Sequence, residues 1–396
     1  GGVVGSGRGA SEPVAAQSED DGMKVLFAGG GTGGHLFPAL AIAGELERLD
    51  RDCRIEFVGT RHGLEAAMTD TIKYPLALLA MRGLPRTVSP GLIAFPFRLA
   101  WSVWQSLRLC ERFRPDVVVG TGGYVCAPVI IAAAMKKIPR ALQEQNSFPG
   151  LVTRRLAPRA TVVFLAYRTA ARHLPEGTNI RFVGNPIRRE LTGGNRAEAL
   201  KKFGLSPERR TILILGGSQG ARRINQAILD GLGCLDDSIQ LLWQCGKRDY
   251  TDVAARLNKK DFAISLFPFS NSMADVYAAA DLAVARAGAL TIAELTAFGV
   301  PMILVPFPYA AADHQTHNAA AVVENGAAEM VADADLDRVN LLEKAVALVR
   351  SDRLPAMRAA ARGMGRPEAA AEIARDIMHL ARPEGETSDH HNHRSR

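Results

Sequence analysis

Few cysteines are present, and none belongs to a recognisable motif. The five cysteines of the 396-residue chain include no CxxC pair and no Cys/His spacing suited to zinc: Cys53, Cys110, Cys126, Cys234 and Cys245. Structural zinc sites need closely spaced Cys and His ligands. The pattern therefore excludes such a site and favours a reducing compartment.

The chain also lacks an apolar run long enough to cross a bilayer. Its longest uncharged apolar stretch, residues 124–135, is short of the roughly 20 residues that a spanning helix needs. Residues 1–22 are rich in Gly, Ser, Ala and acidic residues and have no apolar h-region, so we expect a disordered extension, with Met23 a possible natural start. The polar tail at 383–396, with its three histidines, is expected to be disordered as well. It is assigned no function.

Basic residues are in excess but form no block. The formal charge is +7, without a Lys/Arg cluster or a nucleic-acid motif. Nucleic acid is therefore not an expected partner, whereas anionic lipid and phosphorylated substrates both remain open.

Short apolar runs alternate regularly with helix-length amphipathic stretches, which is typical of βα units around a parallel sheet. Both halves of the chain open with an apolar strand, a glycine turn and a helix. We therefore predict an α/β fold of two Rossmann-like domains, 23–186 and 187–382, facing across a cleft that holds the active site. The expected strands are 24–28, 54–58, 116–119, 141–143, 161–165, 181–183, 211–215, 240–244, 263–267, 282–285, 302–305 and 329–331, and the expected terminal helices are 336–349, 354–362 and 368–380.

The first glycine turn, 29–34, lies where the first strand becomes a helix, so its backbone amides can approach a diphosphate. A turn needed only for packing and an NAD fingerprint are the alternatives. The second strand is followed by Gly59-Thr60-Arg61 and not by an acidic residue for a ribose, which disfavours NAD. His35 ends the turn, where it can serve as a base, a cap or a phosphate ligand.

Two further polar segments follow strands of the first half. A second glycine turn contains Gly122, Gly123 and Tyr124, and it suggests a site for an acceptor diphosphate. The next strand ends in four polar residues, 143–146, which packing alone would rarely require. We interpret this cluster as part of a site.

The second half carries a nucleotide-like pattern. Ser218 lies in a glycine turn that suits a phosphate, and Glu294 lies one turn inside a helix expected to begin near Ala289. The Glu294 carboxylate can accept two ribose hydroxyls, although favouring the helix dipole is a simpler role. Polar side chains at 313–315 and Asn318 suit sugar hydroxyls.

One acidic pair has the DxD spacing of a metal-binding transferase, Asp333-Ala334-Asp335. It lies outside the glycine turns, and an exposed turn in which Asp335 caps the following helix explains it more simply. We predict no required metal and no cofactor.

Aromatic and basic residues are interleaved between 82 and 104, a mixture that can enter an anionic membrane surface. A core helix with a basic outer face is the alternative. The apolar members are Leu92, Ile93, Phe95, Phe97, Trp101 and Trp104, and the basic members are Arg82, Arg86 and Arg98.

Seven motifs taken in order resemble the MurG family: GGGTGGHLFPALAIA, GTGGYV, EQNSFPGL, VGNPIR, GGSQGARRIN, RAGALTIAEL and DHQTHNA. The resemblance covers about residues 24–380. It implies a GT-B glycosyltransferase fold, with the donor mostly in the C-terminal half and a lipid acceptor in the N-terminal half. It also implies an inverting transfer of N-acetylglucosamine from UDP-GlcNAc to lipid I, which yields lipid II, by a peripheral protein on the cytoplasmic face of the plasma membrane.

The resemblance also assigns residues. Those expected to bind UDP-GlcNAc are Thr32, Gly33, Gly34, Asn146, Arg188, Ser218, Ser270, Ala289, Leu290, Thr291, Ile292, Ala293, Glu294 and Gln315, with His314 a further candidate for the sugar. Arg188 and the Ser218 loop would serve the diphosphate and Ser270 would lie beside the uracil. Family members often carry Ile at position 270 and Ser at position 287, where this chain has Ser270 and Ala287, so donor affinity can differ slightly.

The base is expected to be His35, with Glu144 second, because both belong to the acceptor half. The membrane contact is expected at Leu92, Phe95, Phe97, Arg98 and Trp101. Alternatives are a non-hydrolysing UDP-GlcNAc 2-epimerase, another lipid-directed transferase, or a nucleotide-sugar-binding protein without turnover. The full set of motifs argues against the first two, and intact His35, Glu144 and Glu294 argue against the third.

Overall fold

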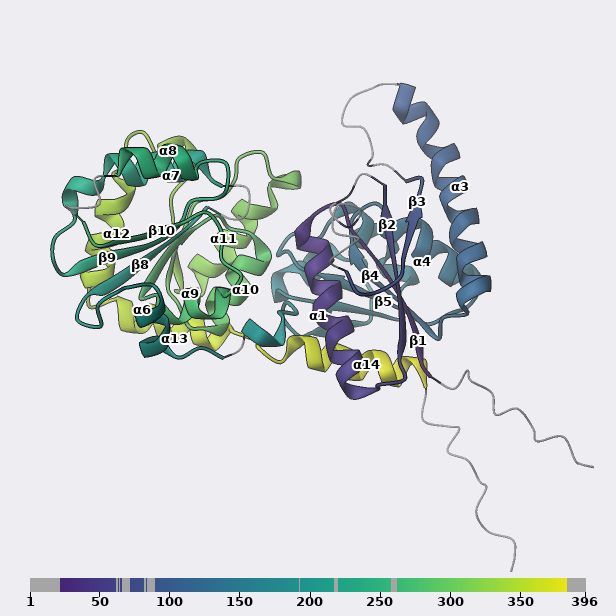
Figure 1. Cartoon of the computed structure of the whole chain (residues 1–396). Helices are drawn as coiled ribbons and strands as arrows, with labels where there is room; N and C mark the ends of the chain where they lie inside the picture. Colours follow the sequence, from purple (N-terminus) through teal and green to yellow (C-terminus); the bar gives the residue numbers. More distant parts are fainter. Residues whose placement is uncertain are drawn as a thin grey trace, which may run out of the picture.

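Two parallel β-sheets, one in each half of the chain, form the centres of two lobes in the computed structural model (Figure 1). The structure describes residues 22–61, 63, 65, 72–81, 83, 90–191, 193–216, 220–257 and 262–382. The strands of the first sheet are β1 Lys24–Gly29, β2 Arg54–Thr60, β3 Leu76–Leu79, β4 Val117–Gly122, β5 Arg140–Glu144, β6 Val162–Leu165 and β7 Ile180–Phe182. Those of the second are β8 Arg210–Leu215, β9 Ile239–Gln244, β10 Ile264–Phe267, β11 Leu282–Ala285, β12 Met302–Leu304 and β13 Ala328–Met330.

Both sheets have the Rossmann strand order. The first runs β3-β2-β1-β4-β5-β6-β7 and the second β10-β9-β8-β11-β12-β13, and their paired strands are parallel. The central strands are continuously apolar and buried because helices cover both faces of each sheet. The predicted fold class, two Rossmann-like domains, is therefore confirmed.

Helices cover the faces of both sheets and close the chain. In the first half they are α1 Gly33–Leu49, α3 Pro90–Phe113, α4 Cys126–Met135 and α5 Leu151–Leu156. In the second half they are α6 Arg196–Lys202, α7 Arg222–Asp230, α8 Tyr250–Arg256, α9 Met273–Ala279, α10 Ala289–Ala297, α11 His314–Glu324, α12 Leu341–Arg350, α13 Leu354–Met364 and α14 Ala369–Ala381.

Two expectations about the elements are corrected. None of the expected strands covers β3, a four-residue strand at the edge of the first sheet that pairs with β2. Helix α12 begins at Leu341 and not at residue 336, because the side chain of Asn340 accepts a hydrogen bond from the Glu343 amide at 3.0 Å and so caps it. Asp335 lies in a separate 3₁₀ turn, Asp333–Asp335, and does not cap this helix.

The chain crosses between the lobes twice. It leaves the first lobe at Gly184. Glycine is required here for two reasons: φ is +90°, and a Cβ at this position would lie 2.5 Å from the Cβ of Arg366. The chain returns to the first lobe after α13, and α14 then packs against α1. In Figure 1, α13 lies along the lower side of the second lobe and α14 along the lower side of the first. Ile373 and Ile377 of α14 lie in the core built by β1 and α1. By its packing, α14 therefore belongs to the first lobe, although it was expected in the second domain, 187–382. The domain limits at 186 and 382 stay a prediction.

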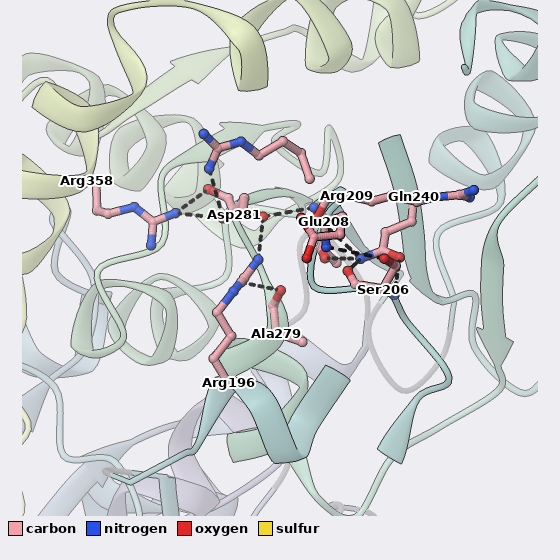
Figure 2. A network of polar contacts seen from close by, with 10 residues as sticks. Arg196, Ser206, Glu208, Arg209, Gln240, Ala279, Asp281 and Arg358 are labelled. Carbon is pink, nitrogen blue, oxygen red and sulfur yellow. Dashed lines mark hydrogen bonds and ion pairs between the residues drawn. The ribbon is translucent and has the colours of Figure 1, made fainter. Parts of the chain in front are cut away.

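A buried carboxylate ties four elements of the second lobe together (Figure 2). Asp281, just before β11, is 4% exposed and meets three guanidinium groups. Arg196 of α6 contacts Oδ2 at 2.7 Å, and Arg358 of α13 and Arg210 of β8 contact Oδ1 at 3.3 and 3.8 Å. The amide of Thr211 also donates to Oδ2 at 2.9 Å. One charge thereby joins α6, β8, β11 and α13.

Two negative observations concern the described residues alone. Their helices include none with the length and apolarity to cross a membrane. All five cysteines are free thiols, and burial raises the pKa of Cys110 and Cys245 to about 11, which makes them poor nucleophiles at neutral pH.

Candidate functional site

The predicted motifs gather where each sheet reverses its strand order. In the first sheet, β1 and β4 lie side by side, so the first glycine turn and the Gly122 turn are neighbours. In the second sheet, β8 and β11 lie side by side, and α10 follows β11. Crevices at such switch points are where doubly wound sheets bind ligands. Figure 1 shows α10 and α11 on the side of the second lobe that faces the first.

His35 lies in the first turn of α1, and its ring is oriented by the backbone. Nδ1 lies 3.1 Å from the carbonyl oxygen of Gly30 and 3.3 Å from Oγ1 of Thr32. Because a carbonyl oxygen only accepts, Nδ1 carries the hydrogen, and Nε2 is the basic nitrogen of the neutral ring. Burial lowers the pKa of His35, although the Gly30 contact and the charges of Glu144 and Glu65 oppose that effect. The neutral, proton-accepting form therefore predominates at neutral pH.

The second glycine turn closes against this ring. A Cβ at position 122 would lie 2.6 Å from Cδ2 and 3.0 Å from Nε2 of His35, and φ at Gly122 is +108°. Thr121, at the end of β4, donates from its hydroxyl to the His35 carbonyl at 2.8 Å. The two turns are thus held together, and Nε2 faces the turn expected to receive the acceptor diphosphate. Gly123 also has a positive φ, and Tyr124 is partly exposed beside it.

Glu144, the second candidate for the base, is buried and accepts three hydrogen bonds. Oε1 accepts from the amide nitrogen and from Nδ2 of Asn146, both at 3.1 Å, and Oε2 accepts from the Gly150 amide at 3.0 Å. A carboxylate with three donors organises the loop after β5 and is poorly placed to abstract a proton. Its contribution to His35 is its negative charge, which favours the protonated ring.

The rest of the polar cluster after β5 joins the lobes. Gln143 donates to Oδ1 of Asn185 at 3.2 Å, and Asn185 donates to the Gln145 carbonyl at 3.0 Å. Nδ2 of Asn185 also lies 3.4 Å from the carbonyl oxygen of Ala289 in the other lobe. The four polar residues were expected to form part of a site, but Gln143 and Gln145 are buried in this joint.

Asn318 of α11 also links the two lobes. Its Oδ1 accepts from the amide and hydroxyl of Ser147 at 2.9 and 3.1 Å, and its Nδ2 donates to Oδ1 of Asn146 at 3.1 Å. Asn318 is fully buried. It was expected near a sugar, and in the structure its side chain contacts Ser147 and Asn146 of the first lobe. No sequence signal distinguishes these roles, because its partners lie in another lobe.

Glu294 of α10 lies against a buried tyrosine and near the charge of an arginine. The Tyr277 hydroxyl donates to Oε2 at 2.5 Å. Burial raises the pKa of Glu294, while Tyr277 and the nearby charge of Arg188 oppose that rise. Helix α10 begins at Ala289, as predicted, which places the residues 289–293 at its amino end. Tyr277 was not expected at this site.

Arg188 and the turn before α9 line a groove of about 870 Å³ between the lobes. One wall is α1, and the other is formed by residues 188–191 and 271–275. Arg188 is exposed, and Ser270 lies just outside the lining, where its Oγ accepts from the Ser272 amide at 3.0 Å. The hydroxyl of Ser270 thereby shapes the turn expected beside the uracil.

The turn before α11 is strained. Ala312 and Asp313 have φ values of 50° and 52°, a left-handed conformation that non-glycine residues rarely adopt in succession. Gln315 accepts from the Phe307 amide at 2.9 Å through Oε1, so its side-chain amide presents N–H donors elsewhere. His314 contacts the Ala311 carbonyl at 2.6 Å. The strain fits a segment shaped for a ligand.

The structure gives the DxD pair a role in packing, and one of the expected donor-binding residues lies outside the described part of the chain. Asp333 of the DxD pair is buried against Arg286 at 2.6 Å and Arg223 at 2.9 Å, so its charge is used in packing. In the described part of the chain, no cluster of three or more His, Cys, Asp or Glu suited to a metal occurs. Ser218 lies outside the described residues, and Thr32, Gly33 and Gly34 lie at the amino end of α1.

Comparison with known proteins gives this geometry its context. Residues 25–165 match the glycosyltransferase family 28 N-terminal domain, and residues 211–377 match its C-terminal domain. A Chlorobaculum parvum protein named UDP-N-acetylglucosamine–N-acetylmuramyl-(pentapeptide) pyrophosphoryl-undecaprenol N-acetylglucosamine transferase is 43% identical, over 91% of this chain and 100% of its own length. A protein of the same name from Caldanaerobacter subterraneus is 38% identical, over 89% and 98%.

The chain belongs to the MurG family. Among solved structures, MurG of Acinetobacter baumannii is similar with a TM-score of 0.75 and 28% identity, covering 90% of this chain and 99% of that one. A UDP-N-acetylglucosamine 2-epimerase shares the fold, with a TM-score of 0.60 and 16% identity over 90% and 96%. The family membership confirms the GT-B fold and the glycosyltransferase class.

Proposed function

We propose that this MurG-family enzyme transfers N-acetylglucosamine from UDP-GlcNAc to the 4-hydroxyl of the MurNAc unit of lipid I, forming lipid II. The observation that carries the proposal is that each sheet has candidate site residues where its strand order reverses, at β1/β4 in the first lobe and at β8/β11 in the second. A basic imidazole nitrogen lies in the first lobe, and the Glu294 carboxylate, which accepts a hydrogen bond from Tyr277, lies in the second. Relatives named for this transfer match nearly the whole chain.

On this proposal the donor lies in the second lobe. Glu294 accepts the ribose hydroxyls, the turn at Ser270 borders the uracil, and Gln315 donates to the sugar. The diphosphate lies near Arg188 and the Ser218 turn. Asn146 reaches the donor from the first lobe, and Asn318 sets its position. The amides of residues 32–34 contribute from the start of α1.

The reaction follows as a single inverting displacement. The acceptor 4-oxygen bonds to the anomeric carbon while the bond from that carbon to the UDP oxygen breaks, and UDP leaves with the electron pair. The hydroxyl proton passes to Nε2 of His35. The charge growing on UDP is met by Arg188 and by the amino end of α10, a preorganised effect often worth several kcal/mol.

Transfer can be tested directly with labelled UDP-GlcNAc and a lipid I analogue, without added metal. The expected product is a labelled disaccharide lipid, with release of one UDP per transfer. Conversion of UDP-GlcNAc without the acceptor, with exchange at the sugar C2, would instead identify an epimerase. Lack of any labelled lipid from folded, donor-binding protein contradicts the proposal.

Replacing Glu294 with alanine is expected to weaken UDP-GlcNAc binding by about 1.5 to 3 kcal/mol, roughly 10-fold to 150-fold, because the ribose loses a charge-assisted acceptor. Calorimetric titration with UDP measures the change. Glu329→Ala, which removes a carboxylate paired with Lys344 and Arg353 on the outer part of the same lobe, is the matched control. Equal UDP affinity in the wild type and Glu294→Ala contradicts the assignment.

The proposed membrane surface is the outer face of α3. Ile93, Phe97, Trp101 and Trp104 are between 48% and 77% exposed and recur at helical spacing, and the two indole rings stack at 4.7 Å. Figure 1 places α3 on the side of the first lobe away from the second. We propose that this stripe enters the membrane surface, with exposed Arg98 beside it.

The expected set of membrane residues changes accordingly. Phe95 packs against the core and does not belong to the stripe. The side chains of Leu92, Arg82 and Arg86 lie outside the described residues. The proposed contact therefore consists of Ile93, Phe97, Trp101 and Trp104, with Arg98 beside them, in place of a set that included Leu92 and Phe95.

The double variant Phe97→Ser/Trp101→Ser is expected to lose at least 10-fold in affinity for anionic phospholipid vesicles, because burying each ring contributes roughly 1.5 to 3 kcal/mol. Vesicle co-sedimentation measures it. Tyr309→Ser, which removes an aromatic ring 78% exposed in the second lobe, serves as control. The stripe is not the membrane contact if the double variant and the control sediment alike.

A further inference from the structure

Glu65 is a buried carboxylate that the proposed reaction has not used. Its side chain is fully buried in the first lobe. Oε2 accepts from the amide of Gly31 at 2.7 Å, and Oε1 accepts from the amide and hydroxyl of Thr60 at 2.7 and 3.1 Å. The carboxylate therefore bridges the first glycine turn and the end of β2.

Three glycines make room for this carboxylate. A Cβ at Gly30 would lie 2.4 Å from Oε1, one at Gly63 would lie 2.1 Å from Oε1, and one at Gly59 would lie 2.3 Å from Cγ of Glu65. Each distance is far inside van der Waals contact. These glycines are thus explained by the carboxylate they enclose, a function that the sequence analysis did not assign to them.

The contact with Gly31 reaches the base through a single peptide unit. The N–H of Gly31, which donates to Glu65, and the carbonyl of Gly30, which faces Nδ1 of His35, belong to the same peptide group. A carboxylate that accepts from the N–H end of a peptide polarises it and makes its carbonyl a stronger acceptor. The hydrogen bonds thus run from the Glu65 carboxylate through the Gly30–Gly31 peptide to the imidazole of His35.

We infer that Glu65 is a positioning residue for His35, acting through the Gly30–Gly31 peptide to fix the Nδ1–H tautomer and to stabilise the imidazolium formed during transfer. The inference rests on the proposed function. No proton passes to Glu65: the acceptor proton stays on Nε2, and the added positive charge is stabilised by the polarised carbonyl. The arrangement resembles the carboxylate–histidine pair of serine hydrolases with a peptide inserted between them.

The same charge bears on the ligand of the first glycine turn. Because the Gly31 amide is occupied and a carboxylate lies behind the turn, a diphosphate there would meet a like charge. This favours the Gly122 turn for the acceptor diphosphate and the second lobe for the donor diphosphate. Residues 30 and 31 then mainly support the base, while the amides of residues 32–34 remain those proposed to reach the donor.

Several charged groups bear on His35 and must be considered together. Glu144 on β5 and Glu65 both favour the protonated ring, whereas His314 on α11 and the burial of the ring oppose it. Removing the charge of Glu65 therefore shifts the pKa of His35 downward, and the acidic limb of kcat/KM moves to lower pH. A purely structural contact would lower stability without moving that limb.

The test compares Glu65→Gln, which keeps the size and removes the charge, with Glu65→Asp, which keeps the charge and shortens the side chain. Glu65→Gln is expected to lower kcat by roughly 10-fold to 100-fold, by analogy with the loss when the hydrogen-bond partner that orients a metal-bound histidine is removed. It should also move the acidic limb to lower pH, while Glu65→Asp leaves the limb near its original position. Glu56→Gln, at a buried carboxylate paired with Arg112, is the matched control and should move neither.

A second readout does not depend on transfer. The ring nitrogens of His35 are followed by ¹⁵N NMR of histidine-labelled protein and assigned by their loss in His35→Gln. The wild type should show the Nδ1–H tautomer, and Glu65→Gln should lower the His35 pKa. An unchanged pKa and tautomer in folded Glu65→Gln overturn the inference, even if transfer occurs. If the shift is seen but the wild type transfers no sugar, the proposed function fails and the link between Glu65 and His35 stands.

Discussion

Replacing His35 with alanine is expected to lower kcat by about 10²-fold to 10⁴-fold, the usual contribution of a positioned general base. The reason is geometric: the Gly30 carbonyl holds the hydrogen on Nδ1, so Nε2 presents its lone pair beside the Gly122 turn. Glu144 does not replace it, because three donors already occupy its carboxylate. Steady-state kinetics with the lipid I analogue measure the loss.

The kinetic pattern separates this role from a structural one. A base acts in the transition state, so kcat and kcat/KM should fall together while UDP binding is unchanged. Because burial lowers the pKa of His35, the acidic limb of wild-type kcat/KM should lie below pH 6.5, the ordinary histidine value, and disappear in His35→Ala. His379→Ala, at an exposed histidine of α14, is the control. Near-normal turnover in His35→Ala would falsify the assignment.

Replacing Asp281 with alanine is expected to lower the free energy of unfolding of the second lobe by roughly 3 kcal/mol, at the lower end for a broken buried ion pair. The variant leaves Arg196, Arg210 and Arg358 near one another without their shared carboxylate, and the Thr211 amide loses its acceptor. The arginines are 29% to 62% exposed, so water compensates in part. Urea unfolding is followed by tryptophan fluorescence in a Trp101→Phe/Trp104→Phe background, in which the buried Trp243 is the remaining tryptophan and reports on this lobe.

Arg210→Ala is the matched control for this prediction. Its guanidinium is 62% exposed and lies 3.8 Å from the carboxylate, so its loss should cost below about 1 kcal/mol. Trp243 lies in the core formed around β8 and β9, so its emission changes only when that core opens. If Asp281→Ala and Arg210→Ala unfold at the same urea concentration, the Asp281 carboxylate does not hold α6, β8, β11 and α13 together.

The strands and the glycine turns could be predicted because both are local features. A buried parallel strand is a short apolar run, and a turn that needs positive φ selects glycine, as at Gly122 and Gly123. Since parallel strands end at one edge of a sheet, the polar residues after them could be assigned to one cleft. The edge strand β3 was missed because its sequence, LALL, contains no β-branched or aromatic residue and therefore lacks the composition typical of a strand.

Helix α3, whose membrane contact is a proposal, could be interpreted only in part from the sequence. The mixture of aromatic and basic residues was visible, but Phe95 was assigned to the wrong face. Successive residues of a helix are separated by about 100°, so Phe95 lies about 200° from Ile93, toward the core that it contacts. Applying that period would have selected Ile93, Phe97, Trp101 and Trp104.

By itself, the sequence determined the two-lobed fold and the family, because these depend on local patterns and on motif order. Only the tertiary structure decided what the polar residues do. Ser147 and Asn318 meet although they are 171 positions apart, and the Glu65 carboxylate reaches His35 through a peptide of another loop. Such hydrogen bonds depend on ångström-scale distances between separate elements, which packing sets and residue spacing does not encode.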